Sequence, residues 1–140
     1  MSSSRRRTAS GTRSKNQVVV LVDDSADVRS SLAEVLRAEG FTVIEAANGR
    51  EAVERTRAAT PDLVLMDLSL PVLDGAAAMR IIKSFVPTRG IPVVALTGLS
   101  LSASDLHALG FDAALRKPCS PHALLECVAA VATTGKRARR

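Results

Sequence analysis

The chain has 140 residues, of which 46% are hydrophobic, 24% are charged and only 2% are aromatic. This length suits a single domain with its own core, and the absence of Trp and Tyr argues against stacking platforms for single-stranded nucleic acid or flavin rings. The formal net charge is +5, but the first sixteen residues carry five positive charges and the last five residues carry four, so residues 17–135 carry −4. An acidic folded region favours a cation site.

The basicity of the chain lies at its two ends. Residues 1–16 hold Ser, Thr, Arg and Gly with almost no apolar residue, so we expect a basic disordered tail there, and a second basic tail over residues 134–140. Such tails would suit nucleic acid, an anionic membrane or an acidic partner, but a solvated end that aids solubility is the favoured interpretation. The folded domain is therefore expected over residues 17–133.

Composition also indicates where the protein works. No apolar run approaches the roughly 20 residues of a membrane span, so no such span is expected. Cys119 and Cys127 are eight residues apart, which is the spacing of neither a metal site nor a redox pair. A reducing compartment is the simplest explanation for free cysteines, so we expect a cytoplasmic protein.

From residue 17 onward, strand and helix patterns alternate. In chain order the sequence predicts a strand at 17–22, a helix at 25–38, a strand at 41–46, a helix at 49–59, a strand at 62–67, a helix at 75–85, a strand at 91–97, a short helix at 101–109, a strand at 112–116 and a helix at 121–132. Three of the strand candidates are continuously apolar, as is typical of parallel strands buried on both faces. Five such units with short connections predict an α/β sandwich.

Helical spacing also predicts which side chains face the core. The expected inward positions are Val28, Leu32, Val35, Leu36, Ala52, Val53, Thr56, Met79, Ile82, Phe85, Leu106, Leu109, Leu124, Val128 and Val131. Asn48 is a plausible N-cap, and Ser120 precedes Pro121 as a cap precedes the first helical position.

Polar residues stand where four of the apolar runs end. Asp23 and Asp24 follow the first run, Asp67 the third, Thr97 the fourth, and Lys117 the fifth. The carboxyl ends of parallel strands in an open α/β sheet converge on one crevice, where ligands bind. Three carboxylates, a hydroxyl and an ammonium in that crevice indicate a site for a divalent cation and a phosphoryl group.

One reaction accounts for each residue type. The Asp67 carboxylate would act as nucleophile toward phosphorus. Asp23 and Asp24 would hold Mg²⁺, which prefers oxygen ligands. Lys117 would supply a second positive charge, and Thr97 would donate a hydrogen bond to a phosphoryl oxygen. Taken singly, each residue has an ordinary explanation, such as Asp24 as a helix cap. Their shared position at successive strand ends favours the joint interpretation.

These residues resemble the receiver domain of two-component response regulators. The resemblance rests on the segments Asp23-Asp24, 67–75, Thr97-Gly98, 110–112 and Lys117-Pro118, and it covers about residues 17–133. It implies a flavodoxin-like, doubly wound (βα)5 sandwich with a parallel five-stranded sheet in the order 2-1-3-4-5.

The resemblance also implies roles for the site residues. Asp67 would be the phosphoacceptor, and Thr97 and Lys117 would contact the phosphoryl group. Mg²⁺ would bind to the carboxylates of Asp23, Asp24 and Asp67 and to the backbone carbonyl of Ser69. The peptide bond before Pro118 would be cis, and neither His107 nor His122 would have a catalytic role.

The chain departs from the family pattern near its fifth strand. Receivers commonly carry Tyr or Phe three residues before the motif lysine, where this chain has Ala114, and Cys119 stands where another aromatic is common. The stretch from Thr97 to Lys117 is also about two residues shorter than is usual in the family, so the fourth helix is expected to be short or shifted. We therefore expect the signal to leave through another face, or the domain mainly to relay phosphate.

The resemblance implies a signalling module rather than an enzyme, one that assists only its own phosphorylation and dephosphorylation. The donor would be a histidine kinase or a histidine phosphotransfer protein, the downstream protein target is unspecified, and the chain would be a monomer or a weak, phosphorylation-dependent dimer. An aspartyl phosphohydrolase would usually have a second Asp where this chain has Ser69. A phosphorylation-independent scaffold with the same fold remains the alternative.

Overall fold

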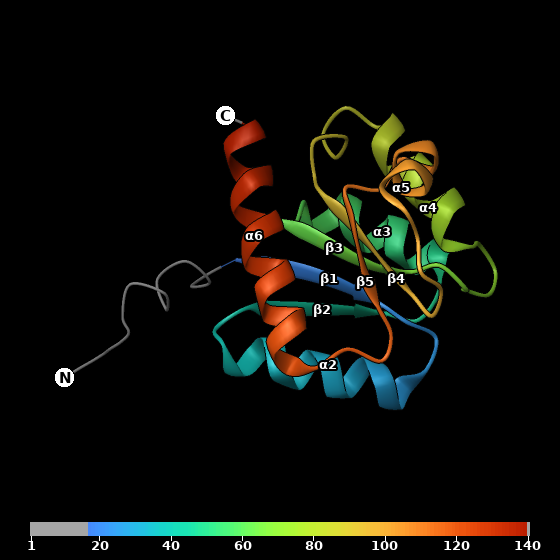
Figure 1. Ribbon diagram of the computed structural model, residues 1–140. Coiled ribbons are helices and arrows are strands. Elements are labelled where there is room, and N and C mark those ends of the chain that lie inside the picture. Colours follow the sequence, from blue (N-terminus) through green and yellow to red (C-terminus); the bar gives the residue numbers. More distant parts are fainter. Residues whose placement is uncertain (1–16, 140) are drawn as a thin grey trace.

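Strands and helices alternate along the whole of the chain that the computed structural model describes, which is residues 17–139 for the backbone and 17–132 for side chains (Figure 1). The elements are β1 (Val18–Val22), α2 (Ala26–Ala38), β2 (Thr42–Ala46), α3 (Gly49–Ala59), β3 (Leu63–Asp67), α4 (Gly75–Ser84), β4 (Val93–Thr97), α5 (Ala103–Leu109), β5 (Ala113–Arg116) and α6 (Pro121–Arg139). The predicted order of strands and helices is confirmed.

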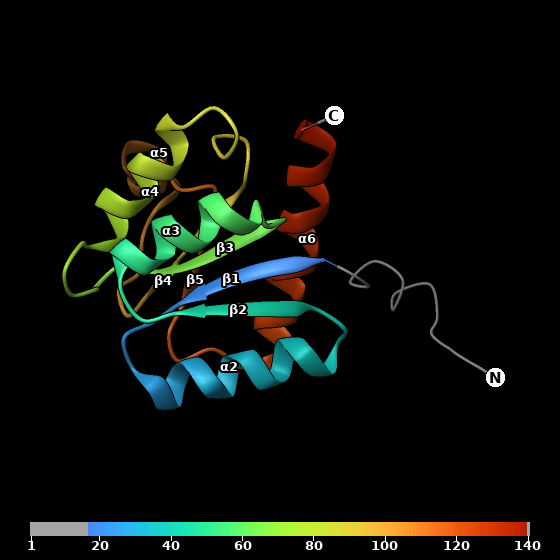
Figure 2. The same ribbon diagram turned by 180° about the vertical axis from the view of Figure 1, so that it is seen from behind.

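The five strands form one parallel sheet in the order β2-β1-β3-β4-β5, which confirms the predicted topology. Helices α2 and α6 cover one face of the sheet, and α3, α4 and α5 cover the other, as the two opposite views show (Figures 1 and 2). All strands point the same way, so their carboxyl ends lie along one edge.

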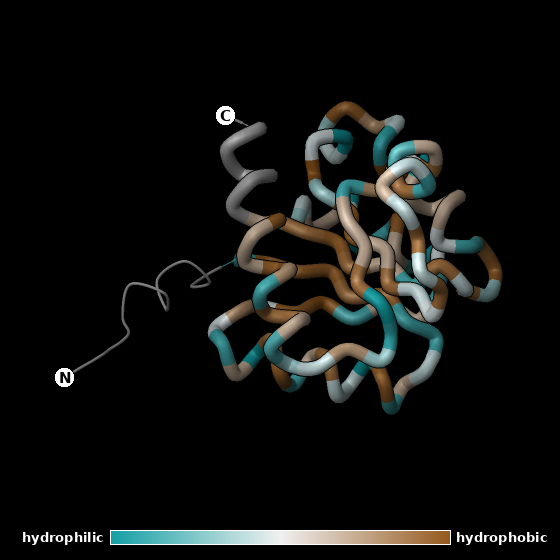
Figure 3. The backbone as a smooth tube through the Cα atoms, in the orientation of Figure 1, coloured by the Kyte–Doolittle hydropathy of each residue, from teal (hydrophilic) through white to brown (hydrophobic). Residues whose placement is uncertain are grey.

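Two apolar clusters, one on each face, explain why the strand sequences are continuously apolar. In β1, Val19 and Leu21 pack with the α2 and α6 side chains, whereas Val20 and Val22 pack with those of α3 and α4. Successive side chains of a strand point to opposite faces, so a strand covered on both sides buries every residue. The hydrophobic central strands are visible in Figure 3.

Short polar side chains begin the helices. Asn48 caps α3 and accepts a hydrogen bond from the Glu51 amide at 2.9 Å, as the sequence predicts. Ser120 accepts one from the Ala123 amide at 3.0 Å at the start of α6, and Asp74 caps α4. These bonds satisfy amides that have no partner within their own helix.

The predicted helices differ from the observed ones mainly at their ends. Helix α6 continues to Arg139, beyond the expected end at residue 132, so residues 134–139 extend that helix in the structure. The expected tail over residues 1–16 lies outside the described residues. Helix α5 has seven residues and no buried side chain, in line with the short helix expected there.

Two of the predicted core positions are wrong. Val28 is 37% exposed because it lies in the first turn of α2, near the edge of the sheet, and Phe85 is 38% exposed because α4 has already ended at Ser84. The Phe85 ring instead lies under the guanidinium of Arg57, 4.6 Å from its centroid. No helix in the described part of the chain is long and apolar enough to cross a membrane.

The turn between β3 and α4 brings the helix against the strand end that carries Asp67. The Gly75 amide donates to the Leu68 carbonyl at 3.3 Å, and a Cβ at Gly75 would run into the carbonyl oxygen of Asp67. Because backbone atoms cannot move aside as a flexible side chain can, this contact requires glycine.

Gly75→Ala should therefore lower the free energy of unfolding by about 1–3 kcal/mol or more, the usual cost of overpacking. Gly98→Ala is a matched control because it also adds one methyl group. Apart from the two chain neighbours of Gly98, no described residue has an atom within 4 Å of the position that this methyl group would take. It should change stability by less than about 0.5 kcal/mol. Urea unfolding measures both, and equal losses in the two variants would contradict the contact at Gly75.

Candidate functional site

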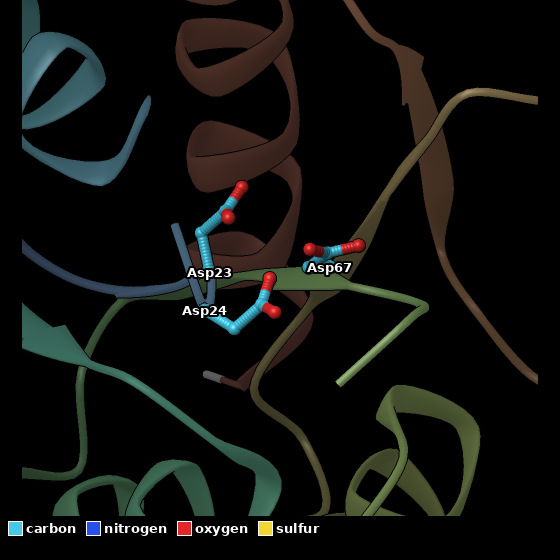
Figure 4. Close-up of side chains that lie close together, drawn as sticks. All are labelled: Asp23, Asp24 and Asp67. Atoms are coloured by element: carbon cyan, nitrogen blue, oxygen red, sulfur yellow. The ribbon is translucent and has the colours of Figure 1, made fainter. Parts of the chain in front are cut away.

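The residues singled out at the strand ends meet at one edge of the sheet. Asp23 and Asp24 follow β1, Asp67 ends β3, Thr97 ends β4 and Lys117 follows β5. One carboxylate oxygen from each of the three aspartates lies within 4.8 Å of the other two, and Figure 4 shows these side chains close together. The strand order places β1 and β3 side by side, which is why aspartates 43 or more positions apart in the sequence meet.

Asp23 is almost completely buried, with 1% of its surface exposed. Its Oδ1 accepts a hydrogen bond from the Ser25 amide at 2.9 Å, and its Oδ2 accepts one from Lys117 Nζ at 2.9 Å. A buried carboxylate needs such partners, because removing an unpaired charge from water would strongly destabilise the folded state. The side chain is therefore fixed at both oxygens.

Asp67 is also buried, with 6% of its surface exposed. Its Oδ1 accepts from the Ser69 amide at 3.1 Å, and its Oδ2 lies 3.4 Å from Lys117 Nζ. Burial raises the pKa of Asp67, and the nearby charge of Asp23 raises it further, whereas the Ser69 amide and Lys117 act in the opposite direction without cancelling the rise. The partners available to Asp67 thus leave its negative charge incompletely compensated.

Lys117 bridges the two buried carboxylates. Burial alone would lower its pKa, but the hydrogen bond to Asp23 and the charges of both aspartates outweigh burial and raise the pKa above its ordinary value. The Lys117 amide also donates to the Thr97 carbonyl at 2.7 Å, which ties the end of β5 to that of β4. The peptide bond between Lys117 and Pro118 is cis, as the resemblance implied.

Thr97 is 5% exposed and lies at the same edge. Its Oγ1 accepts a hydrogen bond from the Leu99 amide at 3.0 Å. A hydroxyl has one proton to donate and two acceptor positions, so this bond leaves the Thr97 proton free to be donated to an incoming oxygen.

The cap of α2 is Ser25, whose side chain accepts from the Val28 amide at 3.3 Å. Asp24 therefore does not serve as the helix cap, and its side chain is exposed beside the two buried aspartates. Ser25 and Arg29 are two functional residues that were not predicted, although a capping residue and a basic residue so soon after an acidic pair are visible in the sequence. Both contact Asp23 in the structure.

The donor set fits a hard divalent cation. All the ligand atoms that the three aspartates offer are carboxylate oxygens, which suit Mg²⁺. Among the described residues, Lys117 is the cation whose side chain contacts these carboxylates, so three negative charges face one positive charge. A divalent cation would balance the excess.

Other residues noted in the sequence lie outside this cluster. His107 and His122 are exposed on the helices α5 and α6. Cys119 and Cys127 are free thiols, and burial raises the pKa of each. Ala114 is half-buried and packs against the apolar cluster that includes Met79 and Ile82 of α4.

Comparison with known proteins identifies relatives for most of the chain. The family model described as the response regulator receiver domain matches residues 19–129. The protein-glutamate methylesterase/protein-glutamine glutaminase of Archaeoglobus fulgidus is 41% identical over 83 residues, covering 59% of this chain and 23% of that protein. The DNA-binding response regulator MtrA of Mycobacterium tuberculosis is 34% identical over 116 residues, covering 81% of this chain and 50% of that protein.

The chain thus spans between about a quarter and a half of the length of these curated relatives. Among solved structures, the receiver domain of the sensor histidine kinase PA1611 of Pseudomonas aeruginosa is 30% identical, with a TM-score of 0.78. The match covers 84% of this chain and 98% of that domain, which was solved with a magnesium ion coordinated in its active-site cleft.

The raised pKa of Asp67 predicts a pH-dependent stability effect in metal-free buffer. Because the folded pKa lies above the ordinary value of 3.8, ionised Asp67 destabilises the fold at neutral pH. That cost decreases as the pH falls through the folded pKa, and it is gone below 3.8, where both the folded and unfolded states are protonated. Asp67→Asn should therefore be more stable than the wild type at pH 7, and its advantage should shrink on acidification.

Urea unfolding over a series of pH values, with a chelator present, measures this difference. Asp24→Asn is the control, since the exposed Asp24 side chain should affect stability by less than about 0.5 kcal/mol at every pH. The raised pKa of Asp67 would be contradicted if Asp67→Asn were less stable than the wild type at neutral pH, or if its stability advantage grew on acidification.

Proposed function

The chain belongs to the response regulator receiver family of two-component signalling proteins, and on this premise we propose that Asp67 is its phosphoacceptor. The observation that carries the proposal is the buried Asp67 carboxylate, held 3.4 Å from Lys117 in a cluster whose negative charge exceeds its positive charge. Such a cluster suits a nucleophilic carboxylate that works together with cations.

The reaction would transfer a phosphoryl group from a phosphohistidine. A carboxylate oxygen of Asp67 forms a bond to phosphorus as the phosphorus–nitrogen bond breaks, and the imidazole of the donor takes up a proton. Lys117 compensates charge on the phosphoryl oxygens, and the free Thr97 proton is donated to one of them. The Ser69 amide holds Asp67 Oδ1, which keeps the carboxylate in a fixed orientation.

Mg²⁺ is the cofactor that this proposal includes. The carboxylates of Asp23, Asp24 and Asp67 would hold it, together with the backbone carbonyl of Ser69. When bound, the cation would offset the negative charge that accumulates between carboxylate and phosphoryl oxygens. The magnesium in the PA1611 receiver domain supports this choice for a related site.

A histidine kinase or a histidine phosphotransfer protein would be the donor, and a downstream protein would read the phosphorylated state. The domain assists its own phosphorylation and dephosphorylation and has no other substrate. Cytoplasm is the proposed compartment, in which the free thiols of Cys119 and Cys127 stay reduced.

We further propose that the output does not depend on an aromatic switch. Ala114 has no side-chain torsion that could move it between a buried and an exposed position, as a Tyr or Phe ring can move. Neighbouring α5 has no fully buried side chain, and it packs against the sheet through the half-buried Leu106 and Leu109. Phosphorylation would therefore act through the backbone around Thr97 and Lys117, or serve mainly to pass the phosphoryl group on.

Incubation with acetyl phosphate tests the phosphoacceptor directly. With Mg²⁺ present, intact-mass spectrometry should show the gain of one phosphoryl group in the wild type and no gain in Asp67→Asn. A chelator should abolish the gain in the wild type, because the transferred group would then lack part of its charge compensation.

Asp74→Asn is the matched control, since Asp74 is an exposed carboxylate on the same loop and Asn retains its capping oxygen. This variant should be phosphorylated as the wild type is. Undiminished phosphorylation of Asp67→Asn, or its loss in Asp74→Asn alone, would refute the assignment, and a wild type that gains no mass would favour the phosphorylation-independent scaffold.

A further inference from the structure

The guanidinium of Arg29 contacts the backbone of the acidic pair Asp23-Asp24. Arg29, in the first turns of α2, donates from Nη1 to the backbone carbonyl of Asp23 at 2.7 Å and from Nε to Glu45 Oε1 at 3.0 Å. The side chain is only 18% exposed. Arg29 thus connects β2, through Glu45, to the loop that carries Asp23 and Asp24.

The bond from Arg29 completes the restraint of Asp23. The Asp23 amide donates to the Ala46 carbonyl at 3.1 Å, and both oxygens of its carboxylate are held by Ser25 and Lys117. The carbonyl is the remaining polar group of the residue, and Arg29 binds it. This carbonyl belongs to the planar peptide group that joins Asp23 to Asp24, so its orientation sets the direction in which the chain enters Asp24.

Asp24 needs such a restraint more than its two neighbours do. The side chains of Asp23 and Asp67 are fixed by hydrogen bonds, whereas Asp24 is exposed, and its carboxylate has no ion pair with any of the described residues. Its place in the cluster therefore depends on the backbone. We propose that Arg29 is a positioning residue that orients Asp24 toward the cation site through the Asp23–Asp24 peptide group; this rests on the proposed Mg²⁺ binding.

Arginine suits this position for two reasons. Its planar fork can donate to a carbonyl and a carboxylate at once in a fixed geometry, whereas the ammonium of lysine is a point charge on a flexible stem. Glu45 offsets the positive charge of the guanidinium, so Arg29 can lie close to a cation site with less repulsion of the cation. Lysine at this position should hold one acceptor and lose the other.

Arg37 offers a matched control on the same helix. It also pairs with Glu45, with Nη1 3.2 Å from Oε2, and it also donates to a backbone carbonyl, that of Val43 at 2.9 Å. That carbonyl lies within β2 rather than in the loop after β1, so Arg37 makes the same kinds of contact without reaching the acidic pair. If Mg²⁺ binding weakens only when Arg29 is substituted, the cause is the contact of Arg29 with the acidic pair and not the loss of a salt bridge to Glu45.

The experiment is an Mg²⁺ titration of the full chain followed by amide NMR, without any phosphodonor. Removal of a supporting partner of a metal ligand typically weakens metal affinity 10- to 100-fold, so Arg29→Gln should raise the Kd for Mg²⁺ about tenfold. Arg37→Gln should leave Kd within about twofold of the wild type, Arg29→Lys should give an intermediate value, and Asp24→Asn provides the reference for a lost ligand. Equal Kd values for Arg29→Gln and Arg37→Gln would overturn the proposal.

Hydrogen exchange in metal-free buffer gives a second readout that does not depend on the cation. The Ser25 amide, bonded to Asp23 Oδ1, should exchange faster in Arg29→Gln than in the wild type, and at the wild-type rate in Arg37→Gln. A wild type that binds no Mg²⁺ would refute the cation part of the proposed function. Unchanged Ser25 exchange in Arg29→Gln would refute the positioning role by itself.

Discussion

Two buried carboxylates share one lysine ammonium at the carboxyl edge of the sheet, and the chemistry of the molecule depends on that arrangement. Each ion taken out of water costs several kcal/mol before pairing is counted, and Lys117 lies closer to Asp23, at 2.9 Å, than to Asp67, at 3.4 Å. Lys117 is therefore the more distant partner for Asp67, and burial raises the pKa of Asp67 by more than the Ser69 amide and Lys117 lower it. Such a carboxylate is stabilised by any further positive charge, which is the property expected of a phosphoacceptor that works with a divalent cation.

The parallel sheet brings the charged side chains of this arrangement together. Parallel pairing of β1 with β3 and of β3 with β4 brings Asp23, Asp67 and Thr97 to one edge. The turns after the strands then aim backbone amides at them, from Ser25, Ser69 and Leu99. The two strands that lead to Asp67 and Thr97 are buried along their whole length, and these hydrogen bonds hold both side chains in place.

Features set by local sequence pattern were predictable, whereas those set by contacts between distant elements were not. Continuous apolar runs predict buried parallel strands, and a capping residue such as Asn48 is recognisable from its neighbours alone. The cluster of Asp23, Asp67 and Lys117 was predictable because strand ends converge. The bond from Arg29 to the Asp23 carbonyl depends on the rotation of α2 and on the reach of a long side chain, neither of which periodicity specifies. The exposure of Phe85 likewise depends on where α4 ends.

The most direct test of the account is a beryllofluoride titration with Mg²⁺, followed by amide NMR on the wild type and on Asp67→Ala. Beryllofluoride occupies the place of a phosphoryl group on a carboxylate, so binding reports on the acceptor without a kinase. The account predicts saturable, Mg²⁺-dependent shifts centred on Asp67, Thr97 and Lys117 that vanish in the variant. Shifts that persist in Asp67→Ala, or a wild type that does not respond, would contradict the claim that this carboxylate cluster is a phosphorylation site.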